Sequence, residues 1–222
     1  MSTKNPLPNV QLKSDYYLAR PATQPGKGVL VIHAWWGLNQ FFKELCDRLA
    51  GEGFFALAPD LYQGKTAATI EEAKKLRSRM KQETVVQQLS AAADQLHKIC
   101  CIAGQGLGVV GFSLGGYWGL WLAEQKSSLV TATVAFYGTR NGDYSTSQSA
   151  FQFHLAEKDE YVATSGVKKL QKSLAAADKV AAFYTYPGTG HWFFESDRPE
   201  AYNSQAAQLA WNRSIEFLKL YA

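Results

Sequence analysis

The sequence predicts an α/β protein with a mostly parallel central sheet flanked by helices on both faces. Short apolar runs rich in β-branched residues alternate with longer amphipathic stretches, which is typical of parallel strands joined by helical crossovers. Each run is short enough to be a strand buried on both faces. The runs are Gly28–Ile32, Phe54–Ala58, Leu107–Phe112, Thr131–Tyr137, Phe151–Ala156 and Val180–Tyr186.

The stretches between these runs predict six helices. In the first, Gln40–Ala50, apolar side chains recur at helical spacing and Gly51 follows as a stop signal. The other five are Thr69–Met80, Glu83–Lys98, Leu114–Gln125, Val162–Ala177 and Pro199–Leu220. With 222 residues, 46 % of them hydrophobic, and with no internal repeat or linker, the chain is expected to form a single domain over residues 1–222.

Charge and composition argue against several kinds of partner. The formal net charge is +4, but Lys and Arg are scattered among acids, which argues against nucleic acid. The basic run Lys74–Lys81 is either a solvated helix face, which we favour, or the source of a cation at a pocket rim. The uncharged window between Lys98 and Glu124 contains seven glycines, which suit a strand, a turn and a closely packed helix better than a membrane span.

The N-terminal residues contain no apolar stretch or cleavage signal of a secreted protein, so the expected location is the cytoplasm. Cys46, Cys100 and Cys101 are an odd number, and two of them are adjacent, which disfavours a disulfide framework. We expect reduced, buried thiols. No metal or organic cofactor is implied, and the sequence does not define the oligomeric state or the roles of Cys100 and Cys101.

The most specific motif is Gly111-Phe112-Ser113-Leu114-Gly115, between a predicted strand and a predicted helix. A strand that runs into Gly-x-Ser-x-Gly and then a helix is the nucleophile elbow of the α/β-hydrolases. The glycines let the strand and helix backbones pass closely, and the strained turn lifts the Ser113 hydroxyl out of the core. Because unpaired N–H groups at the start of a helix favour anions, the Leu114 N–H is a candidate oxyanion donor. The alternative is an ordinary turn with an incidental serine.

A serine nucleophile needs a base and an orienting acid, and in this fold the order is serine, acid, histidine. His33 and His97 precede Ser113, and His154 lies within a predicted buried strand, where it is expected to have a structural partner. His191 stands in the glycine-rich stretch "YPGTGHWFF" after the last predicted strand, so we predict that it is the base.

The predicted acid is Asp159, which follows the penultimate strand directly. Ligand-handling loops of open α/β sheets lie at the carboxyl ends of the strands, and Asp159 falls at such an end. Its neighbours Glu157 and Glu160 are the alternatives, whereas Asp178 lies late in a predicted helix.

Nearly the whole chain resembles the dienelactone hydrolase family of the α/β-hydrolase fold. The resemblance is carried, in the family's order, by "VIHAWWGLN", "FFALAPDLYQGK", "GVVGFSLGG", "VAFYGT", "LAEKDEYV" and "YPGTGHWF". It implies that Asp159 and His191 are the acid and the base, and that the Trp35 N–H is a second oxyanion donor. Trp35 and Trp36 directly follow an early strand, where large aromatic side chains would wall a cleft or equally well fill the core.

The chain departs from that family at two positions. The family's best-known members use cysteine as nucleophile, whereas this chain has Ser113, as in many serine-type relatives. The first departure is Ala34, which stands where relatives commonly carry a glutamate beside the nucleophile. Dienelactone hydrolases also hold the substrate's carboxylate with arginines, one of them shortly after the histidine. Here that stretch reads "HWFFESD", and Glu195 is expected to repel such a substrate, which disfavours dienelactone itself.

Together these features predict a carboxylic ester hydrolase that cleaves a small ester or lactone through an acyl-enzyme. The predicted catalytic residues are Ser113, Asp159 and His191, with the N–H groups of Leu114 and Trp35 as oxyanion hole. The predicted pocket residues are Trp36, Trp192 and Phe193. A thioesterase or peptidase with the same three residues, or a non-catalytic binding protein of this fold, is the alternative.

Overall fold

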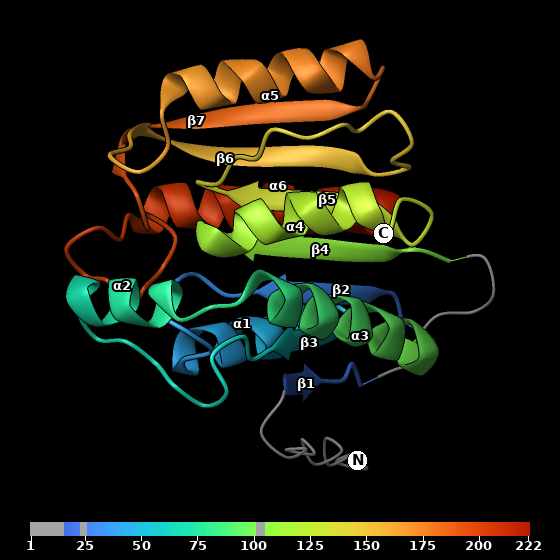
Figure 1. The fold of residues 1–222 in the computed structure, drawn as a ribbon, viewed down its shortest axis with the longest axis horizontal. Coiled ribbons are helices and arrows are strands. Elements are labelled where there is room, and N and C mark those ends of the chain that lie inside the picture. The colour runs from blue at the N-terminus through green and yellow to red at the C-terminus, as the bar shows by residue number, and fades with distance from the viewer. Residues whose placement is uncertain (1–15, 23–25, 101–104) are drawn as a thin grey trace, which may run out of the picture.

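Seven strands form one sheet in the computed structural model, which describes residues 16–22, 26–100 and 105–222. Their order across the sheet is β1-β3-β2-β4-β5-β6-β7 (Figure 1). β1 pairs antiparallel with β3, and every other pair is parallel. The predicted class, α/β with a mostly parallel sheet, is confirmed. The strands are β1 (Tyr16–Ala19), β2 (Gly28–Ile32), β3 (Phe55–Pro59), β4 (Leu107–Phe112), β5 (Val130–Phe136), β6 (Ala150–Lys158) and β7 (Ala181–Gly190).

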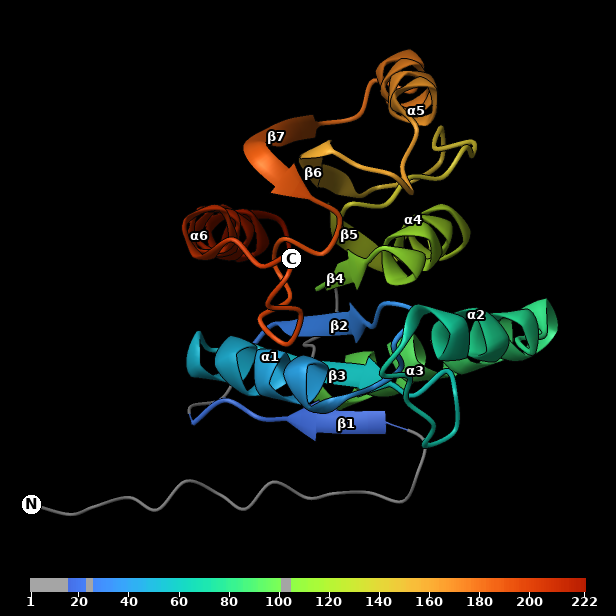
Figure 2. The ribbon, with the colours of Figure 1, turned by 90° about the vertical axis from the view of Figure 1, so that its left-hand side faces the viewer.

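Helices cover both faces of the sheet. α1 (Gln40–Gly51) and α6 (Ser204–Tyr221) lie on one face, and α3 (Gln82–Cys100), α4 (Leu114–Gln125) and α5 (Thr164–Ala176) lie on the other (Figure 2). Each face buries its own apolar cluster; Phe42 belongs to the first and Leu89 to the second. Because most strands are covered on both faces, their sequences are continuous apolar runs.

The short helix α2 (Ile70–Ser78) and the segment between β7 and α6 lie at the same end of the sheet, where the parallel strands terminate (Figure 1). α2 begins at a capping box in which Thr69 and Glu72 each accept a hydrogen bond from the other's backbone N–H. α6 begins at Ser204, later than the predicted Pro199. The reason is that Asn203 provides the cap, accepting a hydrogen bond from the Ala206 N–H at 3.0 Å.

Two parts of the sheet differ from the prediction. β1 has four residues at one edge of the sheet, too short to stand out as an apolar run. β7 extends through Gly190 and includes the first part of the glycine-rich stretch that was predicted to follow the last strand. The pairing of β7 with β6 is irregular between Ala156 and Lys158, and the edge position of β7 accommodates Pro187, which cannot donate a backbone hydrogen bond.

The uncharged window between Lys98 and Glu124 forms, in its described part, strand β4 and most of helix α4. Across residues 16–22, 26–100 and 105–222, no helix combines the length and the apolar character that a membrane span requires. Cys46 and Cys100 are buried, as expected, whereas Cys101 lies outside the described residues.

Candidate active site

The elbow after β4 holds Ser113 in a backbone conformation that is rare for residues other than glycine. Its φ is 52° and its ψ is −108°, and its N–H donates to the Phe136 carbonyl of β5 at 2.9 Å. A side chain on Gly111 would overlap the backbone of Gly115, and one on Gly115 would overlap the Ile32 carbonyl. Both positions therefore require glycine for the close approach of strand and helix.

Three side chains from distant parts of the sequence form a hydrogen-bonded chain at this edge. His191 Nε2 lies 2.8 Å from Ser113 Oγ, and His191 Nδ1 lies 2.8 and 2.9 Å from the two Asp159 carboxylate oxygens. Asp159 Oδ1 also accepts hydrogen bonds from the N–H groups of Tyr161 and Val162, both at 2.9 Å. In this arrangement the imidazole can accept the serine proton while the carboxylate fixes the ring's orientation.

The sheet explains why these three side chains meet. Ser113 directly follows β4, His191 directly follows β7, and Asp159 directly follows β6. Carboxyl ends of parallel strands share one edge, so residues at those ends converge although 78 positions separate Ser113 from His191. The side chains of His191 and Asp159 are 3 % and 7 % exposed, which shields the contact between them from water.

Two backbone N–H groups border the same place. Leu114 is the first residue of α4, and Trp35 lies shortly after β2. Both residues line the cavity beside Ser113. Within the described part of the chain, neither N–H is recorded as donating to another backbone group.

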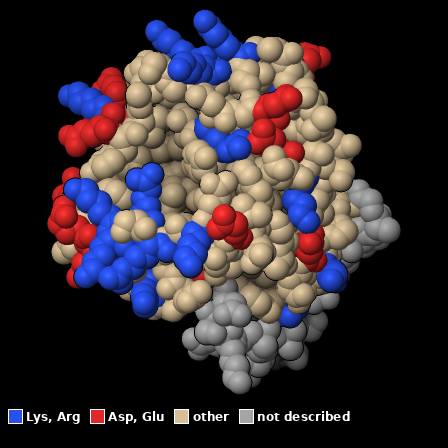
Figure 3. Space-filling model, viewed as in Figure 1, with Lys and Arg blue, Asp and Glu red and all other residues tan. Residues whose placement is uncertain are grey.

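The cavity beside Ser113 and His191 has a volume of about 450 Å³. Much of its wall is aromatic, formed by Trp35, Tyr117, Trp118, Tyr137 and Tyr161. Arg77 of α2 adds the single permanently charged side chain among the described lining residues. Figure 3 shows this face hollowed, with Lys and Arg gathered along one side of the hollow.

The predicted pocket residues Trp36, Trp192 and Phe193 require a correction. All three are buried, but none is among the described residues that line the cavity. Trp192 adopts a φ of 67°, which turns the chain directly after His191. Its ring packs on those of Trp35 and Trp36, with centroids 6.0 and 5.2 Å apart, so it supports the wall from behind.

The expectation for Glu195 is also wrong. Its side chain is fully buried, is absent from the described cavity lining, and accepts a hydrogen bond from the Tyr137 hydroxyl at 2.6 Å. Burial raises the pKa of Glu195 to about 8, so the carboxyl keeps its proton near neutral pH. A neutral group outside the cavity does not repel an anionic substrate.

Two loops frame the hydrogen-bonded chain. The base loop, residues 191–203 between β7 and α6, carries His191. Asn39 Nδ2 donates to Asp197 Oδ2 of this loop at 2.7 Å, and the Arg198 guanidinium lies 3.8 Å from the centre of the Trp36 ring. The base loop is thus fixed to the segment that follows β2 and precedes α1.

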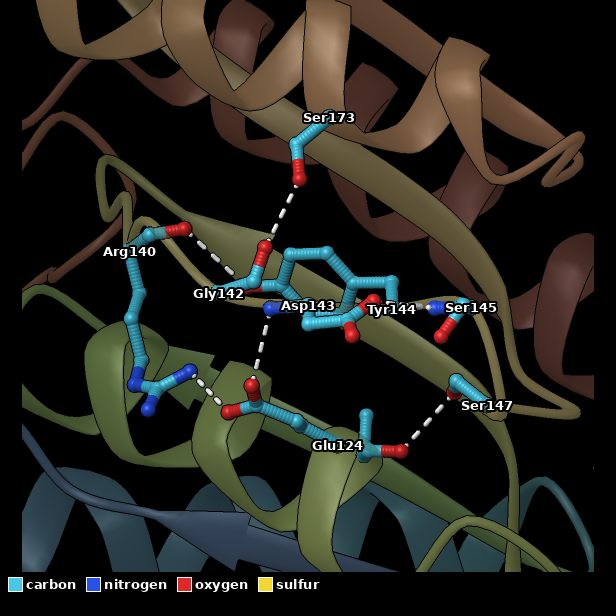
Figure 4. A network of polar contacts seen from close by, with 9 residues as sticks. Glu124, Arg140, Gly142, Asp143, Tyr144, Ser145, Ser147 and Ser173 are labelled. Atoms are coloured by element: carbon cyan, nitrogen blue, oxygen red, sulfur yellow. Dashed lines mark hydrogen bonds and ion pairs between the residues drawn. The ribbon is translucent and has the colours of Figure 1, made fainter.

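The wall loop, residues 138–149 between β5 and β6, contributes Gly138 and Thr139 to the cavity lining. A polar network holds it (Figure 4). Glu124 of α4 forms an ion pair with Arg140 and accepts a hydrogen bond from the Asp143 N–H at 2.8 Å. The buried Tyr144 donates from its hydroxyl to the Arg140 carbonyl at 3.0 Å.

His154 and His33 lie in the core and have structural partners there. His154 contacts the Tyr186 hydroxyl at 2.7 Å through Nδ1 and the Ser214 hydroxyl at 3.0 Å through Nε2. Burial lowers the pKa of His154 to about 3, so it stays neutral in the core, and its predicted structural partner is confirmed. His33 is fully buried, and its Nε2 accepts from the Leu61 N–H at 3.2 Å.

Among the described residues, no three His, Cys, Asp or Glu side chains gather closely enough to hold a metal ion.

The model of the dienelactone hydrolase family matches residues 15–222. The chain belongs to this family. Two curated relatives come from Aquifex: "Protein usf" of Aquifex pyrophilus, 36 % identical, and "Putative carboxymethylenebutenolidase" of Aquifex aeolicus, 32 % identical. Each match covers 214 residues, which is 92 % of this chain and 92 % of the relative.

A solved structure agrees with this family membership. It is a "Putative Dienelactone Hydrolase" from Klebsiella pneumoniae, 26 % identical with a TM-score of 0.82, and the match covers 93 % of this chain and 92 % of that one. The family and the fold make this chain a hydrolase with the α/β-hydrolase fold.

For this dienelactone hydrolase family member, sequence reasoning missed three features of the site. Arg77 is one member of the basic run Lys74–Lys81. The sequence did not show which residue of that run, if any, supplies a cation at the pocket rim. Tyr137 was not predicted as a site residue. The signal that could have identified it is its position at the carboxyl end of a predicted strand. Nothing in the sequence signalled that Glu195 is buried against Tyr137, because the two residues are 58 positions apart.

Proposed function

We propose that this member of the dienelactone hydrolase family is a serine hydrolase that cleaves a small ester or lactone through an acyl-enzyme. The observation that carries the proposal is the continuous chain from Asp159 through His191 to Ser113, which opens onto a cavity. The cavity, about 450 Å³, falls in the range of sites for small molecules.

In the proposed reaction, Ser113 Oγ forms a bond to the substrate's carbonyl carbon while its proton passes to His191 Nε2, 2.8 Å away. Asp159 orients the imidazole through Nδ1 and stabilises the imidazolium. The carbonyl oxygen becomes an oxyanion, which accepts hydrogen bonds from the N–H groups of Leu114 and Trp35. His191 then returns the proton to the leaving oxygen as the carbon–oxygen bond breaks. Water hydrolyses the acyl-Ser113 by the same path, with His191 as base.

The substrate we propose carries an anionic substituent. The name of the Aquifex aeolicus relative refers to a carboxymethylene-substituted butenolide, a lactone. In this chain, three cations are candidates for holding such a group. Lys74 pairs with Glu71 at 2.9 Å and Arg140 pairs with Glu124, whereas Arg77 lines the cavity. Arg77 is therefore the proposed anchor.

A fluorophosphonate probe and a panel of chromogenic esters test the proposal. We expect covalent labelling of the purified protein, and hydrolysis of p-nitrophenyl acetate or a better ester, both lost in Ser113→Ala. Ser147→Ala is the matched control, because Ser147 is a buried serine whose hydroxyl donates to the Ala123 carbonyl at 2.8 Å. Labelling or turnover that survives in Ser113→Ala would reject the proposed nucleophile.

The same measurements separate the alternatives. A non-catalytic binding protein would show neither labelling nor turnover, because it has no activated serine. A thioesterase or peptidase would label but prefer thioester or peptide substrates over the matched oxygen ester. The cavity contents decide between these reactions, since the three polar side chains are common to all of them.

A further inference from the structure

One hydrogen bond joins the base loop to the end of the strand next to the elbow. Tyr137 directly follows β5, and its hydroxyl donates to Glu195 Oε1 at 2.6 Å. Both side chains are fully buried. The Tyr137 ring also packs against the His191 imidazole, with centroids 4.8 Å apart. One side chain therefore contacts His191 with its ring and holds the loop that carries His191 with its hydroxyl.

The charges around this bond keep the Glu195 carboxyl neutral. Burial is the main cause of its raised pKa, and the neighbouring Asp197 acts in the same direction. The Tyr137 hydroxyl and the Arg198 guanidinium favour the ionised form but do not offset the burial. A protonated carboxyl can remain in the core with a hydrogen-bond partner, whereas an unpaired carboxylate there is strongly disfavoured.

Tyr137 is itself held in an unusual backbone conformation. Its φ is 36°, which few residues other than glycine adopt, and its N–H donates to the His154 carbonyl of β6 at 2.7 Å. Conformations of this kind persist where the surroundings fix them, and they are concentrated at functional sites. The backbone of Tyr137 is fixed by β6 and its side chain by Glu195.

We propose that Tyr137 and Glu195 form a positioning pair that sets the His191 imidazole against Ser113. The pair connects β5, the neighbour of the strand that ends in the elbow, to the loop that begins with His191. This inference rests on the proposed function, in which His191 is the base. A misplacement of about 1 Å in such a base can cost roughly 10²-fold in rate, so a single well-placed bond suffices to matter.

The alternative is that the pair only stabilises the core. The two roles give different kinetics. A positioning pair affects kcat more than KM, because the substrate still binds while proton transfer is misaligned. A purely structural pair affects the amount of folded enzyme, and the folded fraction turns over at the normal rate.

Three variants of the full chain test the positioning role with a neutral chromogenic ester. Tyr137→Phe keeps the ring and removes the hydroxyl, Glu195→Leu removes the acceptor, and Glu195→Gln keeps a neutral acceptor of the same shape. The matched control is Tyr144→Phe, which removes one hydroxyl from another fully buried tyrosine, in the wall loop. Thermal unfolding of each variant gives the folded fraction to which kcat is referred.

We expect kcat per folded molecule to fall about 10- to 100-fold in Tyr137→Phe and Glu195→Leu, with KM changed less than about threefold. Glu195→Gln should restore kcat to within about threefold of the parent at pH 7, and Tyr144→Phe should match the parent. The Tyr137→Phe and Glu195→Leu losses should not add in the double variant, because both remove the same bond.

The pH profile gives a second readout. Above pH 8 the parent should lose kcat as Glu195 ionises beside Asp197, whereas Glu195→Gln should show no loss from this cause. If Tyr137→Phe keeps the same kcat as Tyr144→Phe, the positioning role is wrong. If Glu195→Leu fails to fold, the isosteric Tyr137→Phe still decides the question.

Failure of this inference is distinguishable from failure of the proposed function. If Ser113→Ala loses turnover while Tyr137→Phe retains it, the serine hydrolase proposal stands and the positioning pair is rejected. If Ser113→Ala retains turnover, the proposed function itself is rejected.

Discussion

The wall loop and the base loop are both held by a glutamate, but the two glutamates differ. One is paired with a cation, and the other is buried and neutral. Glu124 forms a salt bridge with Arg140, and the two side chains are 15 % and 14 % exposed. Glu195 is neutral, fully buried, and bound to Tyr137. The wall loop lines the cavity with Gly138 and Thr139, whereas the base loop carries the imidazole that contacts Ser113.

The difference follows from where each carboxyl lies. A carboxylate near the surface can keep its charge, because water and an arginine stabilise it. A carboxyl in the core, bound to Tyr137, is less costly to bury with its proton on. Near neutral pH the wall loop should therefore be insensitive to pH, and the base loop should be sensitive.

The largest expected effect comes from removing the imidazole from the base loop. His191→Ala should lower kcat/KM by at least about 10³-fold and abolish fluorophosphonate labelling. His154→Ala is the control: it removes one hydrogen-bond partner each from the Tyr186 and Ser214 hydroxyls and leaves a cavity in the core, so it should lower the thermal unfolding temperature and preserve kcat per folded molecule. The reverse pattern, with activity lost in His154→Ala and kept in His191→Ala, would show that the base is His154 of β6 and not His191 of the base loop.

A second prediction concerns the stability of the base loop as a function of pH. The pKa of Glu195 is raised from 4.5 to about 8 on folding, so between these values the folded chain binds the proton that the unfolded chain has released. Stability attributable to this group is complete below pH 4.5 and is lost as pH rises towards 8. Glu195→Gln cannot ionise, so its advantage over the parent should grow from pH 5 to pH 8.

The size of that advantage is at most about 5 kcal/mol, the free energy that corresponds to a pKa raised from 4.5 to about 8. Chemical denaturation at pH 5, 6.5 and 8 measures it. A constant difference between Glu195→Gln and the parent across the three pH values would show that the buried carboxyl does not titrate as described.

The third prediction tests the wall loop. Glu124→Gln retains an acceptor for the Asp143 N–H but leaves the Arg140 charge without its partner. We expect a loss of about 2 kcal/mol in unfolding free energy, between the values for exposed and buried ion pairs, with little change between pH 6 and 8. KM should rise a few-fold because the cavity wall loosens, while kcat stays near that of the parent. A fall in kcat with KM unchanged would give the wall loop a part in catalysis.

The sequence predicted best what depends on neighbouring residues. The elbow around Ser113 needs glycines at fixed offsets, so its local geometry could be read directly. Asp159 and His191 were found from their order along the chain and their positions after strands, since parallel strands bring their carboxyl ends to one edge. Strand β7 shows the limit of that reasoning, because its last residues looked like a loop and instead continue the strand to His191.

The features that were missed depend on packing between distant residues. Glu195 was expected to repel a carboxylate-bearing substrate, but it is buried against a tyrosine 58 positions away. Trp192 and Phe193 were placed in the pocket by adjacency to His191. The left-handed turn at Trp192 directs them to the core, and a turn of that kind is not visible in residue types alone.

The smallest predicted effect concerns substrate charge, and it corrects the expectation that Glu195 favours neutral substrates. With Glu195 neutral and outside the cavity, the charge that substrate meets among the described lining residues is Arg77. Arg77 is exposed at the cavity rim, so water weakens its attraction for a carboxylate, and we expect a preference of about tenfold in kcat/KM for an anionic ester over its matched neutral analogue.

Arg77→Gln should abolish this preference by lowering kcat/KM for the anionic ester while leaving the neutral ester within about twofold. Lys75→Gln is the matched control, since Lys75 is an exposed cation on the same helix that does not line the cavity. The preference should also shrink between 0.05 and 0.5 M salt, because mobile ions screen an exposed charge over a few ångströms to about 10 Å. If Lys75→Gln reduces the preference as much as Arg77→Gln does, the basic face of α2 acts by its general field, and Arg77 is not the anchor. If the neutral ester is the better substrate of the parent, the aromatic wall outweighs the cation in selecting the substrate.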